Sequence, residues 1–535
     1  MVKTTRIAIG YRVCTLLGAA LIPFALPPAH AQQIMRGAEQ TPAVFSAHLP
    51  SLRGAMAQTE GVGAEHRVRE LKLIPLVDEP GRAADPVVQN KPVPASASVA
   101  VGTGFDGIGV GLGNYTPNYA PPDTTGAVGA TQYVQWVNVH IAVFNKADGS
   151  LVTGPVAGNA LFQPLGGPCA TRNDGDPIVQ YDKAANRWVL SQFAVPGGSA
   201  GYWQCVAVSQ TADATGAYYL YAFQYPQFND YPKMSVWPDA YYVTFNMFTN
   251  TFQGARVCAY DRAKMLAGLP ATQQCFQLSS SYASLLPADV DGATAPPAGS
   301  PNYLVNRLST SLGFWKFHVD WSNSANTTLT GPVSIPVAAY RAACGGGACV
   351  PQPGTSQKLD SLADRLMFRL AYRVVGGIER MVVNHAVMVN TTNRPSSGNA
   401  AVRWYEIRDM STAPTIYQQA SFSPDTKFRW MGSVAMDKVG NMAVGYSTSS
   451  ASSYPGLAFA TRADADTPGT LTGETSIRAG SGSQTQNLSR WGDYTHISID
   501  PVDDCTFWYV GQYLKSNGTW NWSTRIASFK VANCQ

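Results

Sequence analysis

The chain reads Asp176-Pro-Ile-Val-Gln-Tyr-Asp182 and then Asn186-Arg-Trp-Val-Leu-Ser-Gln-Phe193, and this pair of segments predicts its fold. A short apolar strand ends in Asp, a tight turn follows, and an aromatic-rich strand comes next. The same pattern returns at residues 234–246, 432–446 and 494–510. Repeated hairpins along one chain are typical of a β-propeller, in which every blade is a small antiparallel sheet.

Seven blades can be counted over residues 121–535. Their first strands are predicted to start near residues 128, 174, 230, 289, 364, 429 and 490. Six or eight blades would also fit, because the first and fourth blades are weakly patterned. An array of β-sandwiches is the structural alternative, but the pattern recurs too regularly for unrelated sandwiches. We therefore predict an all-β protein, a seven-bladed β-propeller.

The segment 1–31 has the composition of a secretory signal peptide. Lys3, Arg6 and Arg12 form a basic start, an apolar run follows, and Ala29-His30-Ala31 has the pattern of a cleavage site. The apolar run is too short for a membrane-spanning helix, and the sequence has no later stretch of about 18 apolar residues. We expect a secreted or periplasmic protein with no membrane span after signal removal.

Residues 32–120 differ from the rest of the chain. Much of this segment is rich in Pro and Ala and poor in aromatic residues, and residues 99–112 are rich in Gly. Such a composition predicts a poorly ordered leader, a linker or a propeptide. A flexible tether is the simpler interpretation, and a cleaved inhibitory pro-segment is the alternative. The β-propeller itself is expected at 121–535.

The cysteines predict a disulfide framework. Of 9 cysteines, Cys14 lies in the signal peptide, and the others are even in number, which in an exported chain indicates disulfides. Proximity in the sequence suggests four pairs, Cys169–Cys205, Cys258–Cys275, Cys344–Cys349 and Cys505–Cys534. No Cys-x-x-Cys pair and no histidine at ligand spacing accompanies them, so zinc is not indicated.

The composition excludes one class of partner. Charged residues are 13% of the chain and the formal net charge is +4, which is too mild and too dispersed for a nucleic-acid-binding protein. The chain has 25 Tyr and 12 Trp. Sugar rings stack on aromatic faces, so these residues suit carbohydrate binding, although packing in a core explains most of them equally well.

Four motifs carry a resemblance to known proteins. They are Pro122-Asp123-Thr-Thr-Gly-Ala-Val-Gly129, Asn173-Asp-Gly-Asp-Pro177, Asp230-Tyr-Pro-Lys-Met234 and Arg490-Trp-Gly-Asp-Tyr494. Through them the region from Pro121 to Cys534 resembles a family of exported bacterial β-propeller-like proteins with no known reaction. The resemblance implies export and a repeated β fold, and it supplies no catalytic residue.

Charged residues precede most of the predicted first strands. In a β-propeller these strands line the central channel, so residues just before them should meet at one mouth. The candidate ligand-binding residues at this mouth are Asp123, Asp174, Asp176, Asp230, Asp289, Asp364, Arg429, Arg490 and Asp493. Arg429 and Arg490, each followed by Trp, would balance the carboxylates.

A ring of carboxylates allows three roles. It can bind Ca²⁺ through oxygen ligands, supply two carboxyl groups for glycoside hydrolysis, or tie the blades together. Neither Asn173–Asp176 nor Asp289–Gly292 continues into a full EF-hand loop, so an EF-hand is excluded. The sequence assigns no catalytic residue and no metal ligand, and it leaves Ca²⁺ open as a cofactor.

Four histidines of the repeat region lie in different predicted blades, at His140, His318, His385 and His496. Three of them meeting at one point would indicate a metal-dependent polysaccharide lyase. Isolated strand histidines are the simpler interpretation.

The sequence thus favours an exported propeller that recognises an extracellular ligand, a glycan or a cell-envelope polymer, at a charged channel mouth. The first alternative is a glycoside hydrolase or polysaccharide lyase that uses the mouth carboxylates. The second is a structural or adhesive surface protein, which a mouth plugged by its own side chains would favour.

Overall fold

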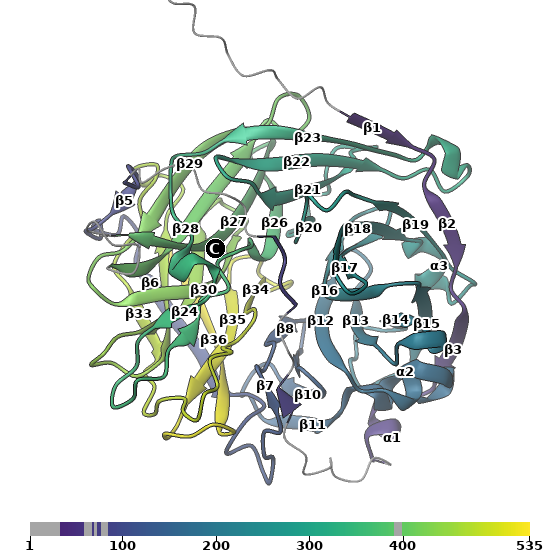
Figure 1. Ribbon diagram of the computed structural model, residues 1–535, viewed down its shortest axis with the longest axis horizontal. Helices are drawn as coiled ribbons and strands as arrows, with labels where there is room; N and C mark the ends of the chain where they lie inside the picture. The colour runs from purple at the N-terminus through teal and green to yellow at the C-terminus, as the bar shows by residue number, and fades with distance from the viewer. Residues whose placement is uncertain (1–32, 58–66, 69–71, 76–83, 390–397) are drawn as a thin grey trace, which may run out of the picture.

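The computed structural model describes the chain except residues 1–32, 58–66, 69–71, 76–83 and 390–397 (Figure 1). The predicted signal peptide therefore lies outside the described residues. The described part of the chain forms seven antiparallel blades arranged in a ring, so the predicted seven-bladed β-propeller is confirmed. The first strand of each blade contacts that of the next, and the seventh contacts the first, which closes the ring.

Blades 1 to 4 are consecutive meanders whose first strand lies innermost. Blade 1 contains β8 (Thr125–Val128), β9 (Gln132–Val137), β10 (His140–Asn145) and β11 (Leu151–Ala157). Blade 2 contains β12 (Gly175–Asp182), β13 (Arg187–Ala194), β14 (Tyr202–Ser209) and β15 (Tyr218–Tyr225). Blade 3 contains β16 (Phe228–Val236), β17 (Tyr241–Phe248), β18 (Phe252–Tyr260) and β19 (Thr272–Gln277). Blade 4 contains β20 (Leu286–Val290), β21 (Asn302–Arg307), β22 (Ser311–His318) and β23 (Thr328–Pro336).

Blades 5 to 7 complete the ring. Blade 5 contains β26 (Met367–Val375), β27 (Ile378–Val389), β28 (Asn399–Arg408) and β29 (Thr415–Phe422). Blade 6 contains β30 (Phe428–Met436), β31 (Met442–Ser449), β32 (Gly456–Arg462) and β33 (Thr475–Arg478). Blade 7 contains β34 (His496–Ile499), β35 (Phe507–Leu514) and β36 (Trp522–Val531). The innermost strands β20 and β26 also pair in parallel, which joins blades 4 and 5.

The Asp of the repeated sequence pattern caps the first turn of its blade. Asp182, Asp437 and Asp500 each accept a hydrogen bond from a backbone N–H two to four residues later, at 2.9–3.1 Å. Such side-chain-to-backbone bonds stabilise tight turns. The second oxygen of Asp182 also reaches blade 3, where Tyr241 donates to it at 2.9 Å and Arg262 forms an ion pair with it.

The leader adds strands to the outer edges of the blades. β1 (Gln33–Arg36), β2 (Glu39–Pro42) and β3 (Phe45–Leu49) pair with blades 4, 3 and 2 in that order. The helix α1 (Leu52–Ala57) then packs on blade 1 through the buried Leu52 and Met56.

The leader later continues around the other side of the ring. β5 (Val88–Gln89) pairs with blade 5, Val93 bridges to Thr472 of blade 6, and β6 (Val99–Asp106) pairs with β36 as the outermost strand of blade 7. The predicted poor order of this segment is therefore corrected for its described stretches. Their side chains are largely exposed, so the blades hold these strands through backbone hydrogen bonds rather than through apolar patterning.

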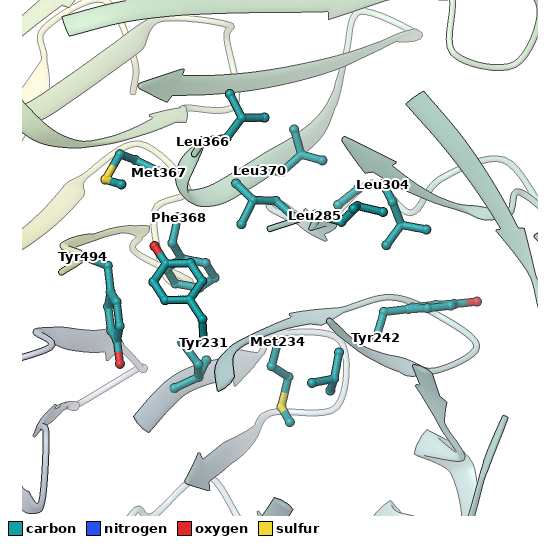
Figure 2. Close-up of a cluster of buried hydrophobic side chains, with 14 of the residues drawn as sticks. Tyr231, Met234, Tyr242, Leu285, Leu304, Leu366, Met367, Phe368, Leu370 and Tyr494 are labelled. Atoms are coloured by element: carbon teal, nitrogen blue, oxygen red, sulfur yellow. The ribbon is translucent and has the colours of Figure 1, made fainter. Parts of the chain in front are cut away.

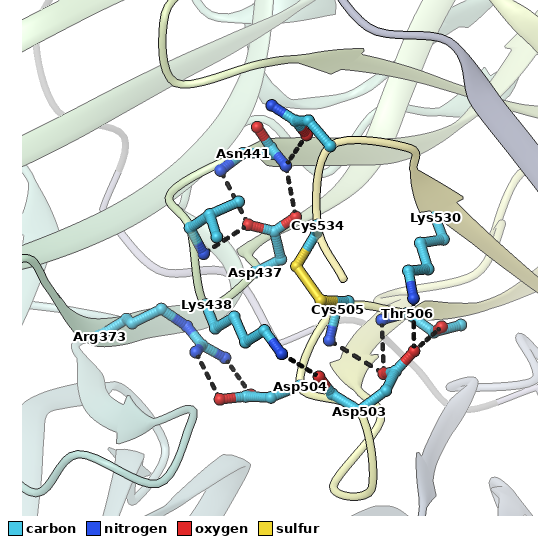
Figure 3. The surroundings of a disulfide bond; sticks show 12 residues. Arg373, Asp437, Lys438, Asn441, Asp503, Asp504, Cys505, Thr506, Lys530 and Cys534 are labelled. Atoms are coloured by element: carbon cyan, nitrogen blue, oxygen red, sulfur yellow. Dashed lines mark hydrogen bonds and ion pairs between the residues drawn. A yellow bond between two sulfur atoms is a disulfide. The ribbon is translucent and has the colours of Figure 1, made fainter.

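All four predicted disulfides form: Cys169–Cys205, Cys258–Cys275, Cys344–Cys349 and Cys505–Cys534. Figure 3 shows the last pair, which joins the turn after β34 to the end of the chain. In the same turn Asp504 pairs with Arg373 of blade 5 at 2.8 Å and Asp503 pairs with Lys530 at 3.3 Å. In the described part of the chain, no helix is long and apolar enough to cross a bilayer.

Apolar side chains fill the space between the first strands of neighbouring blades. Figure 2 shows one part of this core, where residues of blades 3, 4 and 5 meet Tyr494. Met234, Leu285, Met367 and Leu370 are all fully buried there. The ring is therefore packed inside at this level.

Candidate functional site

Every blade begins with one non-glycine residue in the left-handed backbone conformation. We call these residues, whose φ angles run from 46° to 57°, the mouth ring: Asp123, Asp176, Tyr231, Ser284, Leu362, Met431 and Asp493. Left-handed non-glycine residues are uncommon, so their recurrence in all seven blades indicates an architectural role. In β12, β16 and β30 the pairing register shifts at the mouth-ring residue. Such bulges change the direction of side chains at the rims of sheets.

The mouth ring is acidic on one side. Its three Asp residues, Asp123, Asp176 and Asp493, come from the neighbouring blades 1, 2 and 7, and all three are buried. Buried carboxylates need nearby cations or hydrogen-bond donors to stay charged. Lys233, Arg365 and Arg490 supply the positive charge. We call these six residues the mouth cluster.

Lys233 lies at the centre of the mouth cluster. Its ammonium group sits 3.5 Å from the ring centre of Tyr231 and 4.0 Å from that of Tyr494, and it donates to the carbonyl of Pro232 at 2.9 Å. The aromatic faces attract the cation, but the side chain is fully buried. Burial lowers the pKa of Lys233 to about 7, although Asp176 and Asp123 act to raise it.

The two arginines are each paired with an adjacent carboxylate. Arg365 donates to both oxygens of Asp364, at 2.7 and 2.9 Å, and its guanidinium lies 4.5 Å from the ring centre of Tyr231. Arg490 forms a similar pair with Asp493. Burial acts to lower the pKa of Arg365, but the Asp364 carboxylate outweighs this and holds the pKa above its ordinary value.

A cavity of about 190 Å³ opens at the mouth between blades 4 and 5. We call it the mouth cavity. Its lining combines charged, polar and apolar side chains of both blades with two residues of the leader: Ile74, Pro75, Ser280, Ser281, Ala283, Asn306, Arg307, Asp364 and Arg365. Asp364 and Arg365 thus belong both to the charged mouth and to a space that a ligand could enter.

The other sequence candidates have different surroundings. Asp174 forms an ion pair with Arg172 at 3.0 Å and accepts from the backbone N–H of Val195 at 2.8 Å, so it stabilises its own blade. Asp230 lies on β16 directly before Tyr231, and its backbone pairs with Asn246. Both are close in sequence to residues of the mouth ring, but neither lines the mouth cavity.

The structure does not bring Asp289 and Arg429 to the mouth cluster. Asp289 is the fourth residue of β20, well past the mouth, where it binds Arg369 of blade 5 and Gln180 of blade 2 at 2.9 Å each. Burial raises its pKa to about 6 against the opposing effect of Arg369. Arg429 points toward the outer part of its own blade, where it pairs with Glu474 at 2.7 Å.

Sequence reasoning missed Tyr231 and Tyr494 as site residues. Both lie within the motifs Asp230–Met234 and Arg490–Tyr494, but a tyrosine in an aromatic-rich chain carries no signal that separates a site from a core. Their contact with Lys233 depends on two blades that are distant in sequence.

The described residues offer no metal centre. Among them, no group of three or more His, Cys, Asp or Glu side chains is placed to hold a metal ion. Three of the histidines have separate neighbours: His140 contacts the hydroxyl of Tyr115 at 3.0 Å, His385 that of Tyr405 at 2.9 Å, and His496 that of Thr125 at 3.2 Å. The condition set for a metal-dependent lyase is therefore not met by these residues.

No protein-family model matches the chain, and neither does any curated protein sequence. Among solved structures, the N-terminal domain of Nup159 has 9% identity and a TM-score of 0.35, covering 84% of this chain and 100% of that chain. An exo-β-1,3-galactanase from Phanerochaete chrysosporium has 11% identity and a TM-score of 0.30, covering 81% and 97%. A polysaccharide lyase of family PL25, an ulvan lyase, has 11% identity and a TM-score of 0.32, covering 80% and 92%. Similarity this low carries nothing about function over to this chain.

Proposed function

We propose that this chain is an exported protein that recognises an extracellular glycan or cell-envelope polymer at the mouth cavity of its propeller. The observation that carries the proposal is the chemistry of that cavity. Asp364 supplies carboxylate oxygens, Arg365 supplies N–H groups, and Ser280 and Ser281 supply hydroxyls. Sugar hydroxyls both donate and accept hydrogen bonds, so a lining that offers both kinds of partner suits them.

The volume of the mouth cavity limits the size of the ligand that it can hold. Sites for drug-sized molecules enclose roughly 300–1,000 Å³, and this cavity has about 190 Å³. It suits a single sugar residue, such as the end of a chain or one side branch of a polymer. The four disulfides support export, because such bonds persist in oxidising compartments.

Binding is favoured over hydrolysis by the number of carboxylates at the cavity. A glycoside hydrolase of the usual kind needs two carboxyl groups about 5–10 Å apart across an open cleft. Of the described residues that line the mouth cavity, only Asp364 carries a carboxylate, so these residues do not supply the second carboxyl group.

A structural or adhesive role is the second candidate, and one observation favours it. The charged residues of the mouth cluster are almost entirely buried and balance one another, as they would in a clasp that joins blades. Under this candidate the mouth needs no ligand.

Filling the mouth cavity tests the proposal. Ser281 is exposed at the cavity, so Ser281→Trp should fill it without disturbing the core. We expect the variant to lose at least tenfold in affinity, about 1.4 kcal/mol, for whichever probe the native protein binds. The probes are polygalacturonate, dextran and purified peptidoglycan sacculi, measured by affinity electrophoresis or co-sedimentation.

Ser279→Trp is the matched control, because Ser279 is exposed two residues away and does not line the cavity. It should bind like the native protein. Equal affinity of Ser281→Trp and Ser279→Trp would place any binding outside the mouth cavity and sink the proposal.

A further inference from the structure

A second cavity lies on blade 6, at the same face of the propeller as the channel mouth. It has a volume of about 310 Å³, and we call it the blade 6 cavity. Its lining comes from the residue before β30, the end of β31, the start of β32 and the end of β33. Successive strands of an antiparallel meander alternate in direction, so these strand ends lie together. The mouth is where first strands begin, so the two cavities lie at one face.

An exposed aromatic ring lines the blade 6 cavity. Among the described residues, the exposed Phe, Tyr and Trp side chains are Phe45, Tyr417 and Tyr454. Phe45 stacks on Trp203, and the guanidinium of Arg408 lies 3.3 Å from the ring centre of Tyr417. Tyr454 is 38% exposed, and within the described part of the chain no ring or cation packs on it. An aromatic face left open beside a cavity suits the apolar face of a sugar ring.

Glu474 adds a hydrogen-bond acceptor to the lining. Its oxygen Oε2 accepts from Nε of Arg429 at 2.7 Å and from the hydroxyl of Tyr446 at 3.1 Å. No described residue donates to Oε1, so this oxygen is left for a ligand hydroxyl. Arg429 is fully buried and does not line the cavity, so it is a positioning residue that fixes Glu474. The hydroxyls of Ser453 and Ser476 complete a lining that both donates and accepts.

The charge of this region favours an acidic ligand. Lys427 and Arg478 line the cavity as cations, and Glu474 is the only carboxylate among its described lining residues. Arg429 pairs with Glu474 at 2.7 Å and with Asp425 at 2.9 Å. Three cations thus stand against two carboxylates, which leaves one positive charge for an anionic group on the ligand. A sugar acid combines such a group with a ring and with hydroxyls.

We propose that the blade 6 cavity binds a uronic acid unit of an acidic polysaccharide. The sugar ring lies on Tyr454, and one of its hydroxyls donates to Oε1 of Glu474. Its carboxylate meets the cations Lys427 and Arg478. The volume fits this ligand, because sites for small molecules enclose roughly 300–1,000 Å³. The inference goes beyond the proposed function, since it adds a separate site and a charge class of sugar.

Two substitutions test the site, each with a matched control. Tyr454→Ala removes the aromatic face, and Tyr417→Ala removes an exposed tyrosine of blade 5 that does not line the cavity. Lys427→Gln removes a cation of the lining, and Lys264→Gln removes an exposed lysine between β18 and β19 of blade 3. None of the four side chains is buried, so all four variants should fold, which circular dichroism checks.

The measurement is isothermal titration calorimetry of the full-length proteins with trigalacturonate, and with maltotriose as the neutral comparison. The native protein should bind trigalacturonate at least tenfold more tightly than maltotriose. Tyr454→Ala should lose at least tenfold in affinity for trigalacturonate and Lys427→Gln at least threefold, whereas both control variants should bind like the native protein.

Absence of trigalacturonate binding by the native protein overturns the inference, and so does equal affinity for the two trisaccharides. Equal affinity of Tyr454→Ala and Tyr417→Ala would place the binding outside the blade 6 cavity and also overturn it. Ser281→Trp separates this site from the mouth cavity. If it binds like the native protein while Tyr454→Ala loses affinity, the blade 6 site stands without the mouth. The opposite result supports the mouth cavity and removes the blade 6 site.

Discussion

Lys233 is the residue whose protonation the mouth cluster controls most directly. It is fully buried, and four charged groups of the mouth act on it: Asp176, Asp123 and Asp493 attract its charge, and Arg365 repels it. Tyr231 and Tyr494 enclose the ammonium group. Burial raises the pKa of both tyrosines above the usual range, so neither titrates near neutral pH. Lys233 thus changes charge close to pH 7.

This predicts a pH-dependent stability that Lys233→Met should remove. The folded protein releases the lysine proton above about pH 7, whereas the unfolded chain keeps it to about pH 10.5. Between these values the unfolded chain binds more protons, so the free energy of unfolding gained from this site rises with pH. Urea unfolding at pH 6, 7, 8 and 9 should show a native-minus-variant difference that grows above pH 7. A difference that stays constant across this range would contradict a lowered pKa.

At the residue scale, the sequence alone identified five of the charged residues near the mouth. Asp123, Asp364, Arg490 and Asp493 precede their first strands, Asp176 is the second residue of β12, and all five lie near the mouth. Asp289 was expected at the mouth because its strand was predicted to start too late in the sequence. In the structure Asp289 lies inside β20. A shift of a few residues moves a side chain about 3.3 Å along a strand for each position, which is enough to change its neighbours.

At the scale of elements, the disulfide pairs were predictable because antiparallel hairpins bring near neighbours together. Cys258 and Cys275, for example, stand directly opposite each other on β18 and β19. The edge strands of the leader were not predictable, because they need only free backbone groups on a blade and leave no hydrophobic pattern. The first strand of blade 1 was also missed: it is Thr125–Val128, before the predicted start.

Two disulfides of clearly different span, Cys505–Cys534 and Cys344–Cys349, should differ in their contribution to stability. Cys505–Cys534 closes a separation of 29 residues, and Cys344–Cys349 one of 5. Because a longer loop loses more entropy in the unfolded chain, replacing the first pair by Ser should cost about 3–4 kcal/mol and the second about 2 kcal/mol. Urea unfolding midpoints of the two double variants measure this. The reverse order would show that strain or residual structure dominates over loop length.

At the scale of the whole molecule, the leader acts as a belt around the propeller. Its strands pair with the outer edges of blades 2, 3, 4, 5 and 7, α1 covers blade 1, and Val93 reaches blade 6. An outer edge without a partner exposes a row of backbone N–H and C=O groups and invites association with other chains. The role of β6 differs from that of β1–β3, because blade 7 has only three strands of its own.

This difference predicts a graded response to truncation. A chain that starts at residue 51 loses β1, β2 and β3, but blades 2, 3 and 4 keep four strands each, so it should fold with a lower melting temperature. A chain that starts at residue 108 also loses α1, β5 and β6. The loss of β6 uncovers β36 and its buried Ile526 and Phe529, so this chain should associate or fail to fold. The reference is a chain that starts at residue 33. Melting temperature by circular dichroism and size-exclusion chromatography should rank the chains from most to least stable as those starting at residues 33, 51 and 108. Identical behaviour of all three would mean that the leader does not stabilise the propeller.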